Sequence, residues 1–261
     1  MQREKLINIL NGVAREYIPS MVDAQVQDIQ RVAFHISLAL ENAGKDAAAL
    51  SMCDLGGGLG LFSVGCGALG VQRIVLADDF SDPINYEVGD SVFALHRRYG
   101  VEIVSRDIVG QGLGGVDGDF DVVTTFDSME HWHQSPKRLF RETMAALKPG
   151  GTFILGVPNC VNLRKRLTVP LGIGKWSGMD DWYEAEVFRG HVREPDVDDL
   201  RYIARDMGLI DVGILGRNWL GYGSASWAIR SVTRVFDRIL RLRPSLCSDL
   251  YMIGRRPCGV A

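Results

Sequence analysis

The sequence predicts an α/β fold: a Rossmann-like sheet of seven mostly parallel strands, with an antiparallel edge strand and helices on both faces. After residue 44, short apolar runs alternate with helical stretches, the pattern that right-handed βαβ units produce in a parallel sheet. Several of these runs end in an aspartate. The chain has 261 residues, of which 46% are hydrophobic, so it is long enough to bury a sizeable core.

Two helices are expected before the first strand, at residues 3–17 and 21–42. Apolar side chains in the second recur every three or four positions, as they do along one face of a helix. They are Val22, Val26, Ile29, Val32, Ala33, Ile36 and Leu40. We therefore divide the chain into an N-terminal helical extension, residues 1–44, and one α/β domain, residues 45–261.

Five apolar runs between residues 49 and 158 are the expected strands of the parallel part of the sheet. They are "ALSMCDL", "RIVLAD", "VEIVS", "FDVVTTF" and "TFILGVP". The helix before the fifth strand begins in "SPKRLF" and stops at "KPGG", since proline and glycine end helices. The carboxyl ends of such strands share one edge of the sheet, and ligands collect there in open parallel sheets.

The alternation is lost between residues 160 and 191, where glycines, aromatic residues and charges follow no period. A stretch this long without periodic structure is often a functional lid. Its aromatic residues are Trp176, Trp182, Tyr183 and Phe188. The basic run at residues 164–166 has two interpretations, a phosphate or carboxylate contact on the substrate or a solvated turn.

Beyond the lid, "PDVDDLRYIARDMG" has the acidic first turn and glycine stop of a helix, and "LIDVGILGR" is a sixth strand. A basic amphipathic helix, residues 224–243, is inserted before the closing strand, so the last two strands are expected to pair antiparallel at the sheet edge. We expect this helix to cover the sheet or to form a homodimer contact. The alternative is peripheral contact with an anionic membrane.

Composition excludes several classes of protein. The net charge is −3 and the estimated pI about 6.0, which gives no reason to expect a nucleic-acid partner. Five scattered cysteines without a C-x-x-C pair argue against a disulfide framework and a zinc site. The N-terminus lacks the features of a secretory signal, and no apolar run approaches the ~20 residues of a membrane helix. These features predict a cytoplasmic protein.

The glycine cluster "DLGGGLG", residues 54–60, follows the first strand directly. The dinucleotide fingerprint G-x-G-x-x-G needs a third glycine, but the corresponding positions hold Leu61 and Ser63. The pattern acidic-x-G-x-G-x-G is matched in full. Its members are Asp54, Gly56, Gly58 and Gly60.

The chain resembles class I S-adenosylmethionine-dependent methyltransferases over roughly residues 45–215. The resemblance rests on this glycine motif, on the aspartates after the next two strands, and on the stretches "FDVVTTFDSMEHW" and "LKPGGTFILGVPN". The resemblance implies that Asp54 meets the ammonium group of the cofactor. The glycines would clear space for its methionine part. Asp78, or alternatively Asp79, would hold the ribose, and Asp107 with Ile108 would bind the adenine. Phe126, at the end of the fourth strand, is expected to contact the cofactor as well.

The segment "FDSMEHWH" after the fourth strand offers candidates for chemistry on the acceptor. Histidine has a pKa suited to a general base, so His131, His133 and His191 are the candidate catalytic residues. In some members of the family an acidic-x-x-Glu-His run binds a divalent cation, and Asp127, Glu130 and His131 fit that pattern. The resemblance therefore adds Mg²⁺ as a second expectation, beside a purely structural role for this loop.

These features favour methyl transfer from S-adenosylmethionine to a small-molecule hydroxyl, in glycan, glycolipid or natural-product biosynthesis. Amide and DNA-base N-methyltransferases usually carry N/D-P-P-Y/W where this chain reads "FDSM". The alternatives are N- or C-methylation of a small molecule, or a non-catalytic cofactor-binding partner or membrane-associated regulator. The missing third glycine argues against a nicotinamide dehydrogenase.

Overall fold

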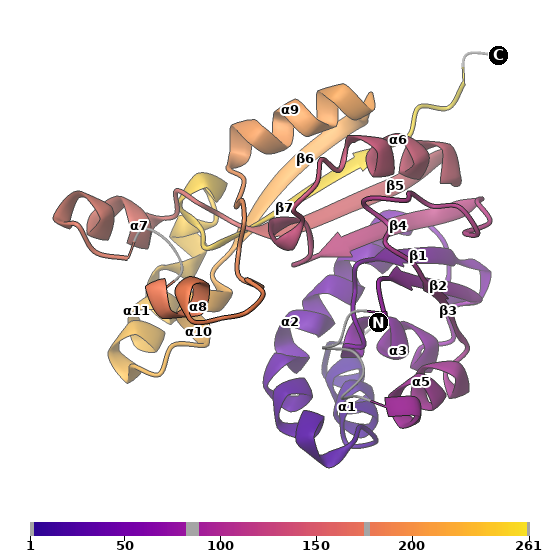
Figure 1. Ribbon diagram of the computed structural model, residues 1–261, viewed down its shortest axis with the longest axis horizontal. Coiled ribbons are helices and arrows are strands. Elements are labelled where there is room, and N and C mark those ends of the chain that lie inside the picture. Colours follow the sequence, from indigo (N-terminus) through magenta and orange to yellow (C-terminus); the bar gives the residue numbers. More distant parts are fainter. Residues whose placement is uncertain (1–2, 82–88, 175–177, 260–261) are drawn as a thin grey trace. The chain divides into compact units, whose positions relative to one another are not determined.

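The computed structural model describes residues 3–81, 89–174 and 178–259. The chain forms two compact units (Figure 1). The first contains residues 1–125, 137–154 and 255–261, and the second contains residues 126–136 and 155–254. The division at residue 44 expected from the sequence stays a prediction.

The strands form one seven-stranded sheet in the order β3-β2-β1-β4-β5-β7-β6. They are β1 (Ser51–Leu55), β2 (Arg73–Asp78), β3 (Val101–Ser105), β4 (Phe120–Phe126), β5 (Leu147–Pro158), β6 (Ile210–Arg217) and β7 (Asp249–Arg255). β1 runs parallel to both β2 and β4, and β2 runs parallel to β3. β7 is antiparallel to β5, because the start of each strand pairs with the end of the other. The predicted fold class is confirmed.

The helices of the first unit are α1 (Arg3–Ala14), α2 (Pro19–Ala43), the short η1 (Ala47–Ala49), α3 (Leu61–Ala68), α5 (Gly89–Arg98) and α6 (Lys137–Ala146). Proline in its first turn starts α2, and Gly44, with a φ of 65°, ends it. α1 and α2 pack tightly on α3: a Cβ at Gly65 would lie 2.6 Å from Leu10 and 2.9 Å from Ile36. The two N-terminal helices are therefore part of the packed first unit.

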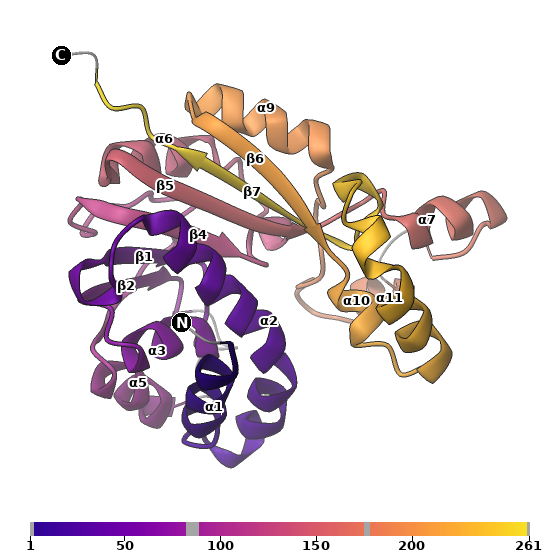
Figure 2. The ribbon, with the colours of Figure 1, turned by 180° about the vertical axis from the view of Figure 1, so that it is seen from behind.

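The helices of the second unit include three within the predicted lid. The elements are η2 (Met129–His131), α7 (Leu163–Thr168), η3 (Val169–Leu171), α8 (Met179–Tyr183), α9 (Val197–Met207), α10 (Trp219–Tyr222), α11 (Trp227–Leu240) and η4 (Pro244–Leu246). Figure 2 shows α9 lying along β6. The predicted helix over residues 224–243 is present as α11, and Asp237 is its buried residue. Its apolar residues are exposed and do not cover the sheet, while the homodimer contact stays a prediction.

None of the helices in the part of the chain that the structure describes combines the length and apolarity that crossing a bilayer requires.

Candidate functional site

The glycine loop after β1 is built from three consecutive glycines with two different roles. Gly56 and Gly58 have φ values of 68° and 57°, in the left-handed region that favours glycine. Gly57 is needed for space, since a Cβ there would lie 2.0 Å from Asp54 Oδ2. Gly60, with a φ of −77°, is the N-cap of α3. The loop therefore brings bare backbone against a buried carboxylate at the start of a helix.

Asp54 is held in place from two sides. Ser63 Oγ donates a hydrogen bond to its Oδ2 at 2.9 Å, and Thr124 Oγ1 donates one to its Oδ1 at 3.0 Å. Burial raises the pKa of Asp54 to about 6, although these two hydrogen bonds partly oppose the rise. A carboxylate in this state would be stabilised by a cationic group placed against it.

Asp78 and Asp79, the two candidates at the end of β2, make different contacts. Asp78 Oδ2 accepts a hydrogen bond from the backbone N–H of Gly58 at 2.8 Å. Asp79 accepts one from the backbone N–H of Ser81 at 3.0 Å. Asp78 therefore contacts the glycine loop, whereas the Asp79 carboxylate accepts a hydrogen bond from the turn that follows it.

The remaining predicted cofactor residues follow β3 and β4. Asp107 Oδ1 accepts a hydrogen bond from the backbone N–H of Gly110 at 2.8 Å, and Ile108 beside it is buried. Phe126 belongs to the second unit, where its ring centroid lies 6.1 Å from that of Tyr251. These contacts fix the turn after β3 and the end of β4.

Tyr17 and His96 support the glycine loop, and sequence reasoning did not single out either of them for this role. The Tyr17 hydroxyl donates to the carbonyl oxygen of Gly60 at 2.8 Å, and its ring meets that of His96 edge-on at 6.2 Å. Burial raises the pKa of Tyr17, so its hydroxyl stays protonated as a donor. Neither residue belongs to a recognisable motif, because each lies far from the glycines in sequence.

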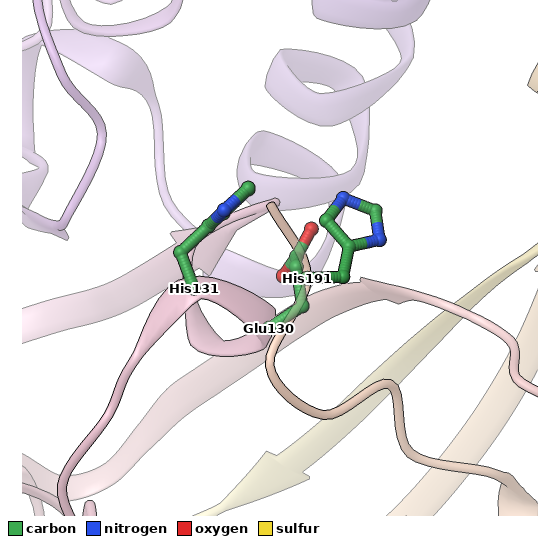
Figure 3. A group of neighbouring side chains, drawn as sticks. All are labelled: Glu130, His131 and His191. Atoms are coloured by element: carbon green, nitrogen blue, oxygen red, sulfur yellow. The ribbon is translucent and has the colours of Figure 1, made fainter. Parts of the chain in front are cut away.

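Glu130, His131 and His191 form a cluster in the second unit, shown in Figure 3. One potential ligand atom of each side chain lies within 4.8 Å of those of the other two. Glu130 and His131 belong to η2, and His191 follows the lid. The backbone N–H of Val192 donates to the carbonyl oxygen of Glu130 at 2.7 Å, which holds the two segments together.

The hydrogen bonds of the two histidines orient their rings. His131 Nδ1 lies 2.9 Å from the carbonyl oxygen of Arg189, and His191 Nδ1 lies 2.7 Å from Glu194 Oε1. Because both partners accept, each Nδ1 carries the hydrogen. In the neutral ring Nε2 then keeps its lone pair, the state required of a general base or a metal ligand.

The pKa values of the two histidines are shifted in opposite directions. Partial burial lowers the pKa of His131, whereas the hydrogen bond to Glu194 raises that of His191. Burial alone would raise the pKa of Glu194, but hydrogen bonds from His191 and Lys165 lower it to about 2. Neighbouring groups whose pKa values are shifted apart in this way are suited to hold and to release a proton.

The structure assembles a different cation-ligand set from the one the sequence indicated. Glu130 and His131 are joined by His191, and Asp127 is not a member of this group within the described ranges. Asp127 has a φ of 51°, and its backbone N–H donates to the carbonyl oxygen of Gly156. Two imidazoles and one carboxylate do not fit Mg²⁺, which prefers oxygen ligands. His133 is exposed and lies outside the cluster.

Two members of the basic run in the lid are engaged within the second unit. Lys165 pairs with Glu194, and Arg166 Nη2 donates to the carbonyl oxygen of Ser245 at 3.1 Å. Arg166 also lines a cavity of about 660 Å³ beside α9 and β6. Trp182 and Tyr183 are exposed, and Trp176 lies outside the described residues.

Comparison with known proteins gives a consistent picture of the fold. A family model described as a methyltransferase domain matches residues 27–212. No curated protein sequence matches the chain.

Three solved structures illustrate the likeness. One is an S-adenosylmethionine-dependent methyltransferase of Thermotoga maritima, a possible histamine N-methyltransferase (14% identity, TM-score 0.52, 96% of this chain and 99% of that one). Another is an O-methyltransferase family protein of Burkholderia thailandensis (16% identity, TM-score 0.50, 91% of this chain and 61% of that one). The third is magnesium protoporphyrin IX methyltransferase of Synechocystis PCC 6803 (13% identity, TM-score 0.55, 92% of this chain and 88% of that one). At sequence identities this low, the similarity establishes the fold alone.

Proposed function

The chain belongs to the class I S-adenosylmethionine-dependent methyltransferase family, and we propose that it methylates a small-molecule hydroxyl. The expected acceptor is a sugar, a lipid-linked glycan or a secondary metabolite. The histidine cluster carries this proposal, because a hydroxyl must lose its proton when it is methylated. The sequence "FDSM" after β4, in place of the N/D-P-P-Y/W motif, also favours oxygen over an amide or base nitrogen.

On the donor side, the glycine loop and three aspartates are proposed to hold the cofactor. Asp54 would pair its buried carboxylate with the cofactor's ammonium group, and Gly57, without a side chain, lets this carboxylate lie against the loop. Asp78 would accept hydrogen bonds from the ribose, since its carboxylate already orders Gly58. Asp107 and Ile108 would bind the adenine. When bound, S-adenosylmethionine supplies a methyl group activated by the sulfonium.

On the acceptor side, His131 is proposed as the general base. Its lowered pKa keeps the ring neutral near pH 7, and its Nδ1 contact leaves Nε2 to accept the hydroxyl proton. His191, held by Glu194, would orient the hydroxyl through a hydrogen bond. Positioning of this kind supplies much of the rate in a displacement that needs no covalent enzyme intermediate.

A divalent cation at Glu130, His131 and His191 is the second arrangement to be tested, because three potential ligands converge there. The two imidazoles favour a transition-metal ion such as Mn²⁺ or Zn²⁺ over Mg²⁺. If the histidine base acts alone, a chelator will leave turnover unchanged. Loss of turnover that Mn²⁺ restores would support the cation instead.

Two broader alternatives remain beside the hydroxyl proposal. N- or C-methylation would use the same donor residues, and a non-catalytic partner or regulator would bind the cofactor without turnover. We further propose that the protein works in the cytoplasm, since its described cysteines are free thiols. Sedimentation of the purified protein tests whether it forms a homodimer.

The deciding experiment measures transfer of labelled methyl groups to a panel of phenols, alkyl glycosides, isoprenoid alcohols and primary amines. His131→Asn is expected to lower kcat by about 10²-fold or more, while S-adenosylhomocysteine affinity stays within a few fold. His133→Asn is the matched control and is expected to keep full turnover. Unchanged turnover in His131→Asn would exclude the base, and labelled amines with no labelled ethers would exclude the hydroxyl acceptor.

A further inference from the structure

α11 packs on the second unit through its polar side. The buried Asp237 accepts hydrogen bonds from Asn218 Nδ2 at 2.9 Å and Arg241 Nη1 at 3.3 Å. Thr233 packs so closely against α10 that a Cβ at Gly221 would lie 2.2 Å from its Oγ1. These contacts fix which face of the helix points outward.

The outward face is apolar along the whole helix. Trp227, Val235 and Ile239 are 72%, 69% and 62% exposed. Ile229, Val232 and Phe236 are exposed as well. At 3.6 residues per turn, these six positions fall within an arc of roughly 200°. An exposed apolar face of this extent marks a binding surface.

A row of arginines borders this face. Arg230, Arg234 and Arg238 follow one another at spacings of four residues on one side of the helix. Arg241, directly after α11, continues this row and pairs with Asp237. The helix contains a single acidic residue, Asp237, which is buried and paired. The surface is therefore apolar in its centre and positively charged along one border.

We propose that α11 docks on an anionic lipid surface, with its apolar face among the acyl chains and its arginines at the headgroups. Apolar side chains bordered by arginines match the two layers that such a surface presents. A twofold contact with a second copy would place arginines of both helices near one another with no exposed acidic residue on α11 to offset them. The proposal is independent of the acceptor proposed above.

The neighbouring segment of the second unit has the same character. Leu167, Leu171 and Ile173, on and after α7, are exposed, and Arg164 is exposed beside them. Both ribbon views place α7 and α11 at the same end of this unit. A surface larger than one helix would thus be available to the lipid.

Flotation of the full chain with vesicles tests the proposal. Vesicles of phosphatidylcholine mixed with phosphatidylglycerol are expected to carry the wild-type protein, and vesicles of phosphatidylcholine alone are expected to carry about tenfold less. Val235→Glu with Ile239→Glu should lower binding at least tenfold, as should Arg234→Glu with Arg238→Glu. Tyr202→Glu, at an exposed position on α9, is the control and should bind like wild type.

Two measurements keep the result interpretable. S-adenosylhomocysteine binding should be unchanged in every variant, which shows that each one is folded. Trp227 emission should shift to the blue on anionic vesicles, and that shift should be absent in Trp227→Phe. Absence of vesicle binding by the wild-type protein would overturn the proposal. So would full binding by the Val235→Glu, Ile239→Glu variant, or a dimer in solution that this variant abolishes without any vesicle binding.

Discussion

The Asp54 carboxylate lies against the backbone of Gly57, where a Cβ would stand 2.0 Å from Asp54 Oδ2. The carboxylate is held in that position, because Ser63 and Thr124 donate hydrogen bonds to its two oxygens. The three glycines in a row are thereby accounted for: two adopt a positive φ, and the one between them makes room for the carboxylate.

Gly57→Ala should therefore weaken S-adenosylhomocysteine binding by about tenfold or more, since the new methyl group must displace Asp54 or the loop. Isothermal titration calorimetry measures this directly. Gly12→Ala, at a helix position with nothing within 4 Å, is the control and should keep the affinity and the melting temperature, or raise the latter. Equal affinities in the two variants would show that the loop can absorb the methyl group.

Cofactor affinity should depend on the protonation of Asp54. Burial raises its pKa to about 6, so the carboxyl is mainly protonated below that pH and cannot attract an ammonium group. The affinity for S-adenosylhomocysteine should fall about tenfold per pH unit below 6 and level off above it. Asp54→Asn should bind weakly at every pH. A wild-type affinity that stays constant between about pH 5 and pH 8 would contradict this role.

Asp78 and Asp79 should differ in their effect on binding. Asp78→Ala removes the acceptor of the Gly58 N–H and should lower S-adenosylhomocysteine affinity at least tenfold. Asp79→Ala, the matched neighbour, should lower it by no more than a few fold, since the Asp79 carboxylate accepts from Ser81. A larger loss in Asp79→Ala would assign the ribose to that residue.

The ring of His191 should titrate at a lower pH in Glu194→Gln than in wild type. The Glu194 carboxylate raises the pKa of His191, and the amide cannot do so. A raised histidine pKa stabilises the folded state below the unfolded value of about 6.5, and this contribution is lost as pH rises through the folded value. Glu194→Gln should thus destabilise the protein more at about pH 6 than at about pH 9.

Imidazole NMR with a chelator present measures the titration midpoint of His191 in both proteins. Urea unfolding at about pH 6 and about pH 9 measures their free energies of unfolding. Equal midpoints for His191 in the two proteins would remove Glu194 from this role.

The strands and the longer helices could be predicted because each has a local apolar period with a glycine or an aspartate near its end. The short helices α7, η3 and α8 of the lid have no such period. Asp54 could be found from a local pattern as well, since the glycine motif contains it. The choice between Asp78 and Asp79 could not be made, because adjacent residues at a strand end point to opposite sides and only the loop contact separates them.

Two other features depend on tertiary contacts that no spacing encodes. His191 joins Glu130 only because the chain returns after the lid and its backbone binds η2. For α11, periodicity identified the apolar face correctly but could not tell which side would pack on the protein. Asp237 decides that, since its hydrogen bonds to Asn218 and Arg241 bury the polar side.

Parallel calorimetric titrations with S-adenosylhomocysteine and NAD⁺ test the donor site most directly. We predict that the wild-type protein binds S-adenosylhomocysteine, that Asp54→Asn and Asp78→Ala each weaken this binding at least tenfold, and that NAD⁺ produces no binding heat. Tight NAD⁺ binding without S-adenosylhomocysteine binding would contradict the account. Unchanged S-adenosylhomocysteine affinity in both aspartate variants would contradict the roles given to the glycine loop and its carboxylates.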